Sequence, residues 1–275
     1  MSRKNKVKKK KTVGDHILTI VLIVAICIFC YAAFNLYHIY TEYKKGTDEY
    51  NSISEMAVTE RDPDQVEEID QPDEQPVAPV SIDFDSLRSI NEDVIGWIYM
   101  EALPEISYPV VQGDDNEYYL HHTFEKKENF SGAIFMDITC RPDFSSDNSI
   151  LFGHNLKTGE MFGELKKLYD TDYNSEADYR KHPIVWVVTP DTAMEYQIFA
   201  AREISVEKDT DMYMVDFAQK EEYQAWMQKQ KELSMYETDT DISSFEPMLT
   251  LSTCTSDTED GRFVVQAVRI QKSVQ

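Results

Sequence analysis

The chain has 275 residues and a formal net charge of −23, and this charge is distributed unevenly. Residues 1–40 carry seven Lys or Arg against one acidic residue, so residues 41–275 carry a net charge of −29. A surface this acidic argues against nucleic-acid binding, because phosphate neutralisation requires Lys and Arg. The length allows one domain of about 150–250 residues plus additional segments, which is enough to bury a core without disulfides.

The N-terminus has the pattern of a membrane anchor. A basic cluster in residues 1–15 precedes eighteen uncharged residues, 17–34, and the apolar character continues to Tyr40. About twenty residues span a bilayer core, and the positive-inside rule places residues 1–15 in the cytoplasm and the rest outside. A cleaved signal peptide is the alternative, but the apolar run is longer than its usual core of about 7–15 residues. We therefore predict an uncleaved single-pass transmembrane signal-anchor over residues 16–40, with the remaining chain outside the cell membrane.

Residues 41–80 have the composition of a linker. They contain twelve Asp or Glu, three Lys or Arg, four prolines and few large apolar side chains. Such a segment cannot bury enough apolar surface to offset its ordering entropy. We predict an acidic spacer that contributes no core, whose first residues continue the anchor helix, followed by a folded domain over residues 81–275.

From Ser81 onward, the pattern predicts mostly strands. A helix is expected over residues 82–90, capped by Ser81 or Asp83, with a short helix over 116–122 and a longer one over 215–233. Runs of β-branched and aromatic residues predict eight strands, at 94–99, 106–111, 132–136, 149–152, 184–188, 195–201, 248–253 and 263–270. Eight short strands without a βαβ rhythm predict a mainly β fold with a closed or nearly closed barrel.

Cys254 and Arg262 are the first candidates for chemistry. Cys254 ends one predicted strand, a polar turn follows, and Arg262 opens the last strand. Two strands joined in this way are expected to be hairpin neighbours, which would bring the two side chains together. A thiolate needs a nearby cation or general base. Arg keeps its proton, so Arg262 can supply only charge and hydrogen-bond donors.

His154 and Ser252 are candidates for the same site. His154 directly follows an apolar strand and Gly153, a position at the mouth of a β-structure where function is often found. By spacing alone, a structural histidine stays the more common interpretation. Ser252 lies two residues before Cys254 and therefore on the same strand face, with either a site role or a packing role.

Two cysteines, Cys140 and Cys254, lie outside the predicted anchor. They could form a disulfide, or one could remain a reactive thiol. Cys140 belongs to no motif, so we interpret it as a bystander. The sequence contains no metal-ligand constellation and no Gly-rich phosphate loop, so no cofactor is expected.

Three segments together resemble the motifs of sortases. In chain order they are Leu151-Phe-Gly-His154-Asn, Thr250-Leu-Ser-Thr-Cys254 and Gly261-Arg262-Phe-Val-Val. The Thr-Leu-Ser-Thr-Cys form and the long helix before it resemble class B sortases in particular, and the similarity covers about residues 82–271. The resemblance implies a closed eight-stranded barrel with added helices, and cysteine transpeptidase activity. It also implies cleavage of a C-terminal sorting signal after its Thr, a thioester on Cys254, and transfer to an amine of a cell-wall precursor or pilin subunit. His154 would then be the acid/base and Arg262 the electrostatic helper.

Two other functions fit parts of the pattern. One is a different extracytoplasmic cysteine enzyme, either a protease or an L,D-transpeptidase. The latter class carries its His and Cys within one short segment, whereas His154 and Cys254 are a hundred residues apart. The other is a non-catalytic, membrane-anchored surface-binding domain, in which both residues would be replaceable.

Overall fold

The computed structural model describes residues 13–61, 76–169, 183–255 and 260–270. The chain divides into two compact units, Met1–Lys45 and Gly46–Gln275, which are taken separately below. Helix α1 (Val13–Ala57) belongs to both units.

The described part of the first unit is helical and apolar. Large side chains such as Ile17, Phe29 and Tyr37 are exposed along this part of α1. The helix is long and apolar enough to cross a membrane, as predicted for residues 16–40.

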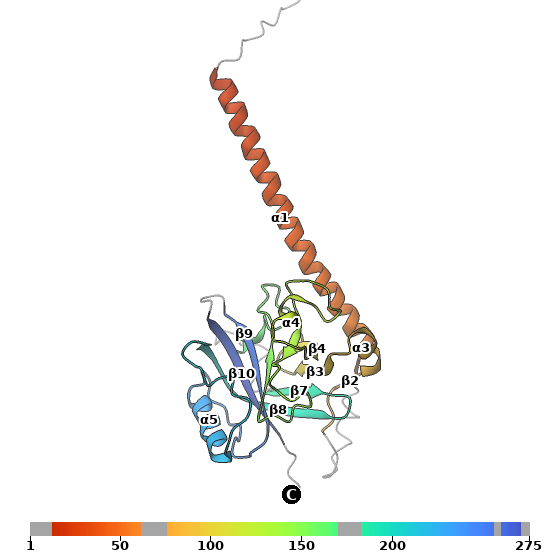
Figure 1. Cartoon of the computed structure of the whole chain (residues 1–275), viewed down its shortest axis with the longest axis vertical. Coiled ribbons are helices and arrows are strands. Elements are labelled where there is room, and N and C mark those ends of the chain that lie inside the picture. Colours follow the sequence, from red (N-terminus) through yellow and green to blue (C-terminus); the bar gives the residue numbers. More distant parts are fainter. Residues whose placement is uncertain (1–12, 62–75, 170–182, 256–259, 271–275) are drawn as a thin grey trace, which may run out of the picture. The chain divides into compact units, whose positions relative to one another are not determined.

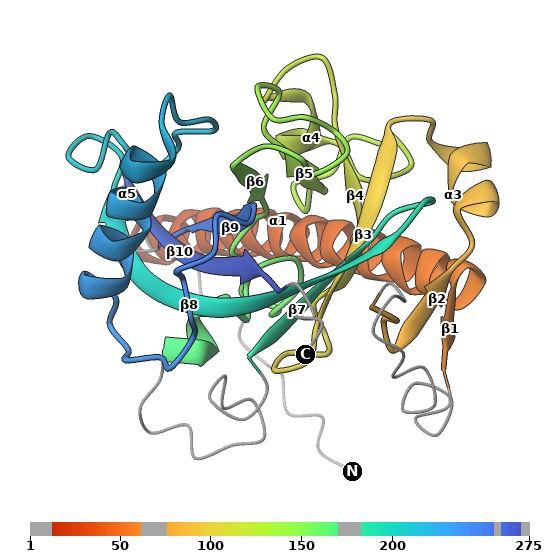
Figure 2. The same cartoon turned by 90° about the horizontal axis from the view of Figure 1, so that it is seen from below.

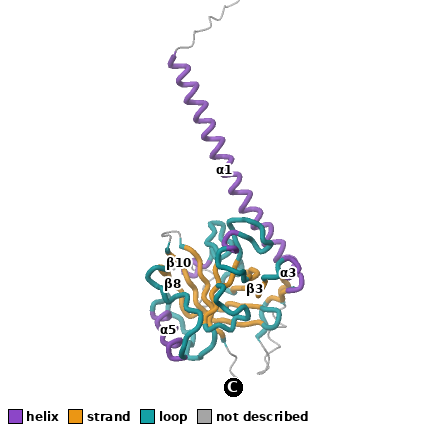
Figure 3. The backbone as a smooth tube through the Cα atoms, viewed as in Figure 1, coloured by secondary structure: helices purple, strands orange, loops and turns teal. Residues whose placement is uncertain are grey.

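The second unit is built around a closed barrel of eight strands (Figure 1). Its strand order is β10-β8-β7-β3-β4-β5-β6-β9. The backbone tube in Figure 3 shows these strands, in orange, grouped together within the second unit. The strands are β3 (Val94–Met100), β4 (Ser107–Val111), β5 (Ile134–Met136), β6 (Asn148–Phe152), β7 (Ile184–Val188), β8 (Ala193–Ser205), β9 (Met248–Cys254) and β10 (Gly261–Arg269). The predicted mainly β fold with a closed eight-stranded barrel is thus confirmed.

Two of the barrel's strand pairs are parallel. These are β4 with β5 and β6 with β9, while the other six neighbouring pairs are antiparallel. A parallel pair needs a long crossover between its strands. In the second case the crossover joins β6 to β9, whose paired residues are a hundred positions apart, such as Phe152 and Ser252.

The helices of the second unit largely follow the predictions. Helix α3 (Phe84–Ile90) is capped by Asp83, whose carboxylate accepts a hydrogen bond from the Ser86 amide at 3.0 Å. Helix α4 (Tyr118–His121) lies within the predicted short helix, and the short 3-10 helix η1 (Leu165–Tyr169) was not predicted. Helix α5 (Lys220–Glu232) starts later than predicted, because the backbone is still extended at its N-cap, Gln219.

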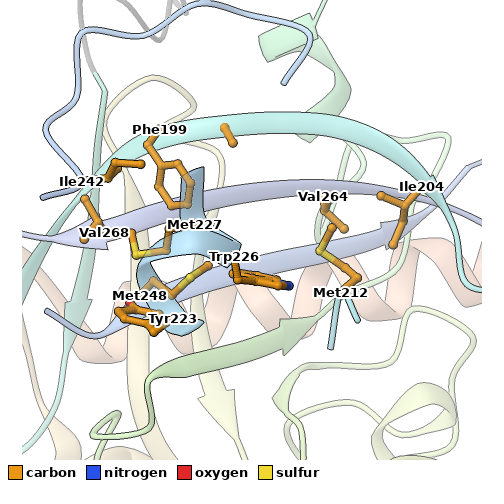
Figure 4. Close-up of a cluster of buried hydrophobic side chains, with 11 residues drawn as sticks. Phe199, Ile204, Met212, Tyr223, Trp226, Met227, Ile242, Met248, Val264 and Val268 are labelled. Atoms are coloured by element: carbon orange, nitrogen blue, oxygen red, sulfur yellow. The ribbon is translucent and has the colours of Figure 1, made fainter. Parts of the chain in front are cut away.

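Helix α5 covers the outer face of the barrel beside β8, as Figures 1 and 2 both show. Its buried Tyr223, Trp226 and Met227 pack against β8, β9 and β10 (Figure 4). The cluster also includes Phe199, Ala200, Ile204, Met212, Ile242, Met248, Val264 and Val268. Strands β9 and β10 are covered on both faces, so nearly all of their residues are buried, including the polar Thr250, Ser252 and Gln266.

Part of the predicted spacer belongs to the core, which corrects the expectation that residues 41–80 contribute none. Tyr50, Ile53 and Ala57 of α1 are buried in the second unit. Strand β1 (Val58–Glu60) pairs antiparallel with β2 (Val80–Ile82). The composition of residues 41–80 as a whole is acidic, but seven of its twelve acids lie in residues 62–74. The three buried residues precede that stretch and form one helical face, which an average composition does not reveal. Residues 62–75 lie outside the described part of the chain.

Candidate active site

Strand pairing brings Cys254 and Arg262 together, as the sequence predicted. Cys254 is the last residue of β9 and is exposed, although the rest of that strand is buried. In the antiparallel ladder between β9 and β10 it lies directly opposite Arg262. The Thr255 amide donates to the Gly261 carbonyl at 3.0 Å and closes the ladder beyond the pair. The thiol thus stands at the rim of the barrel beside a permanent positive charge.

His154 reaches the same rim through the parallel pairing of β6 with β9. Phe152 lies opposite Ser252, so two residues further on the two strands bring His154 alongside Cys254. Three hydrogen bonds fix the two segments to each other. The Gly153 amide donates to the Ser252 carbonyl (3.2 Å), the Thr253 hydroxyl donates to the Gly153 carbonyl (2.8 Å), and the Asn155 amide group donates to the Cys254 carbonyl (2.8 Å).

The orientation of the His154 ring is set by helix α4. Its Nε2 lies 2.7 Å from the carbonyl oxygen of Leu120. A carbonyl can only accept, so Nε2 must carry a hydrogen. In the neutral ring, Nδ1 is then the nitrogen that can take up and return a proton.

All four residues that the sequence singled out line one cavity of about 210 Å³. Its other walls are mainly apolar. The complete lining is Asn116, Leu120, Phe135, Phe152, Gly153, His154, Val206, Tyr213, Ser252, Thr253, Cys254 and Arg262. An apolar cleft with a few convergent polar groups is the usual form of a small binding site. Among the described residues, no group of His, Cys, Asp and Glu is arranged to hold a metal ion.

Ser252 is buried beneath the thiol and is joined to Tyr213. The two hydroxyl groups lie 2.8 Å apart. Burial raises the pKa of Tyr213, whereas the Ser252 hydrogen bond and the Arg262 charge lower it; a negative charge on Cys254 would add to the rise. The phenol therefore stays protonated at neutral pH and can donate a hydrogen bond inside the cavity.

Cys140 has the surroundings of an inert thiol. It is buried, donates weakly to the Asn148 carbonyl and accepts from the Ile150 amide. Burial raises its pKa to about 11, so it stays protonated at neutral pH. Cys140 and Cys254 are both free, which leaves Cys254 available for chemistry.

Several residues in or beside the cavity were not predicted as site residues. Tyr213 comes from the connection between β8 and α5, where no periodic pattern marks it. Leu120 acts through its carbonyl, for which no side-chain pattern exists. Asn155 directly follows His154 in the motif, and that adjacency was the one available signal.

Comparison with known proteins agrees with this geometry. The sortase domain family matches residues 98–270. Over 190 residues the chain is 34% identical to sortase B of Listeria monocytogenes, covering 68% of this chain and 73% of that protein. The chain belongs to the sortase family.

Solved structures place the sortase in class B. One is sortase B of B. anthracis in complex with AAEK1, with a TM-score of 0.65 and 29% identity over 84% of this chain and 99% of that one. Another is Clostridium perfringens sortase B, with a TM-score of 0.62 and 29% identity over 68% of this chain and all of that one. The protein is therefore a class B sortase, and the family is one of cysteine transpeptidases.

Proposed function

We propose that this sortase cleaves a C-terminal sorting signal of secreted proteins after its Thr and transfers the new acyl end to an amine. The acceptor is an amine of a cell-wall precursor or of a pilin subunit. The observation that carries the proposal is the meeting of an exposed thiol, an imidazole and a guanidinium on one cavity wall, from Cys254, His154 and Arg262. The chain is also similar to a Staphylococcus aureus sortase B–substrate complex, at 30% identity and a TM-score of 0.61, which supports a substrate-binding role for this fold.

Cys254 is the proposed nucleophile. His154 takes up the thiol proton as the sulfur attacks the Thr carbonyl carbon, and the peptide C–N bond breaks as His154 gives that proton to the leaving amine. The result is a thioester on Cys254. The acceptor amine then attacks the thioester and gives a proton to His154, and the C–S bond breaks as His154 returns that proton to the sulfur, which restores the thiol. Nδ1 of His154 is the atom that carries the proton, because the Leu120 carbonyl occupies Nε2.

Arg262 is the proposed electrostatic helper. Both tetrahedral intermediates place a negative charge on the former carbonyl oxygen, and a fixed cation beside the sulfur stabilises it. Arg262 lies opposite Cys254 in the β9–β10 ladder and donates to the Gly261 carbonyl at 2.8 Å, which holds the guanidinium at the rim. Ser252 is proposed as a supporting residue that orients the Tyr213 hydroxyl toward the bound peptide.

The proposed location is the outer face of the cell membrane. The exposed apolar side chains along residues 17–40 suit a lipid environment, and the basic residues before them suit a cytoplasmic N-terminus. Protease added to intact cells is expected to digest the barrel domain and to spare residues 1–15. Protection of the barrel under these conditions would contradict the proposed topology.

The catalytic roles are tested with quenched pentapeptides that contain a Thr at the cleavage site. Cys254→Ala should abolish cleavage and covalent capture, while Cys140→Ala should leave both unchanged. His154→Ala should remove most of the rate and change its pH dependence. Arg262→Lys should lose about 10²–10³-fold, the scale of one missing oxyanion donor, and Arg262→Ala should lose more.

Each role has an outcome that would overturn it. Turnover by Cys254→Ala would exclude this residue as the nucleophile and would leave a binding domain as the better hypothesis. A wild-type rate in Arg262→Ala would make that residue an ordinary barrel charge. Adding different amines to the wild-type reaction identifies the acceptor class, since the accepted amine appears in the ligated product.

A further inference from the structure

The last turns of α1 contact the loop that supports His154. Tyr50 is buried there, and its hydroxyl donates to the carbonyl of Gly132 at 2.7 Å. The same hydroxyl accepts from the Phe124 amide at 3.1 Å. One side chain of α1 thus fixes two backbone groups at opposite ends of the loop that follows α4.

Gly132 lies directly against the His154 ring. Its φ is +59°, and a Cβ placed on it would stand 3.0 Å from Cδ2 of His154 and 2.9 Å from the Leu120 carbonyl oxygen. That carbonyl is the partner of Nε2 in the same ring. The Leu120 carbonyl and the backbone of Gly132 therefore border the Nε2–Cδ2 edge of the imidazole. The Tyr50 hydroxyl binds the carbonyl of Gly132.

Neighbouring residues of α1 hold the same loop. The Glu49 carboxylate accepts from the Glu125 amide at 3.0 Å. The ring of Tyr50 packs edge-on against Tyr108, with centroids 5.5 Å apart and an interplanar angle of 86°. These contacts fix the Tyr50 ring, so its hydroxyl has a defined position relative to Gly132.

We infer that Tyr50 is a positioning residue for His154, acting through the Gly132 carbonyl. The inference rests on the proposed acid/base role of His154. Tyr50 is not part of the cavity lining, so it contacts no substrate and is not itself catalytic. Without its hydroxyl, the Gly132 carbonyl and the Phe124 amide lose a shared partner. The loop can then relax and the imidazole edge loses one of its two supports.

The test is Tyr50→Phe in the full-length chain in detergent micelles. The matched control is Tyr223→Phe, which removes a similarly buried hydroxyl that is bonded to the carbonyls of Glu246 and Asp147, just before β9 and β6 begin and so away from Cys254 and His154. One readout is cleavage of the quenched peptide, resolved into kcat and KM. The other is the rate at which iodoacetamide alkylates Cys254 as a function of pH, followed by mass spectrometry.

Tyr50→Phe should lower kcat by about 10- to 100-fold with little change in KM, the scale of a misplaced catalytic group. It should also change the pH dependence of Cys254 alkylation, because the position of the imidazole relative to the thiol changes. Tyr223→Phe should lower the melting temperature by about as much as Tyr50→Phe does, but it should change neither kcat nor the pH dependence of Cys254 alkylation. Gly132→Ala should change the alkylation profile in the same direction as Tyr50→Phe, because its Cβ would stand 2.7 Å from the Tyr119 carbonyl oxygen, 2.9 Å from that of Leu120 and 3.0 Å from Cδ2 of His154.

A wild-type alkylation profile and a wild-type kcat in Tyr50→Phe would overturn the inference. Equal changes in Tyr50→Phe and Tyr223→Phe would overturn it as well, because they would indicate a general loss of stability. The alkylation readout needs no substrate. If the wild-type enzyme cleaves none of the peptides, the proposed substrate class fails while the effect of Tyr50 on the Cys254–His154 pair is still measured.

Discussion

Gly153→Ala probes how closely the loop that carries His154 is packed. A Cβ on Gly153 would stand 2.4 Å from Cδ1 of Ile134, and 2.7 Å and 2.9 Å from two ring atoms of Phe162. Ordinary contacts begin at 3.4 Å, so the loop or its neighbours must move by about 1.0 Å. Ile134 and Phe162 are fully buried, which makes movement of the loop the easier response.

The size of the effect follows from that displacement. Overpacking of this kind costs about 1–3 kcal/mol of folding free energy, and a shift of about 1 Å in a catalytic group costs about 10²-fold in rate. Gly153→Ala should therefore fold with a lower melting temperature and lose about a hundredfold in kcat. Cys254 should still react with iodoacetamide, because the thiol itself stays at the end of β9.

The assay compares peptide cleavage and thermal unfolding for three variants. Gly113→Ala is the control, since its Cβ would come no closer than 3.3 Å to the ring of Tyr119. In the double variant, Ile134→Val removes the atom nearest to the new methyl group and should restore part of the lost rate. A wild-type rate in Gly153→Ala, or no recovery in the double variant, would refute the packing argument.

Three further predictions concern groups outside the cleft. Cys140→Ala should keep full activity and lose about 1 kcal/mol of stability in urea denaturation, since one buried hydrogen-bond acceptor is removed; a loss of activity would contradict the bystander interpretation. Arg141→Ala removes an ion pair in which the guanidinium donates two hydrogen bonds to the Asp216 carboxylate, near Tyr213 in the chain. Both side chains are about half exposed, so KM should rise less than about fivefold, and the rise should be smaller still at high salt. Burial raises the pKa of Glu49, so the folded state keeps this proton at pH values where the unfolded state has released it, and stability falls as pH rises above about 4.5. The melting temperature of Glu49→Gln relative to wild type should increase from pH 4 to pH 7, and a constant difference would contradict this assignment.

The barrel could be predicted because each strand carries its own local signal. The run of β-branched residues at 184–188 predicts β7 with the bounds that the structure has, and the other seven strands were each expected within a few residues of their position. Strand β8 is longer than predicted, because pairing with β10 extends it to Ser205, where the local sequence is mixed. Pairing energy from a distant strand is invisible in a short window of sequence.

The residues of the site likewise fall into those that a local motif marks and those that only the folded chain brings there. The sequence singled out Cys254, His154 and Arg262 as candidates because each lies in a short contiguous motif. It could not show the Leu120 carbonyl or the Tyr50 hydroxyl beside the histidine's loop, since these come from distant segments and one of them is backbone. The contribution of residues 46–57 was missed for a different reason. An average over forty residues is dominated by the acids, while three apolar residues at helical spacing are enough to form a buried face.

The parallel pairing of β6 with β9 has a consequence for folding. Contacts between residues a hundred positions apart are slow to form, because the intervening chain must be closed into a large loop first. Strands β9 and β10 also leave the ribosome later than β6, because they follow it in the chain. The thiol of Cys254 therefore meets the imidazole of His154 only when the barrel closes, so we expect nascent or partly exported chains to be inactive. The order of synthesis therefore delays the meeting of these two side chains until β9 has been made and paired with β6.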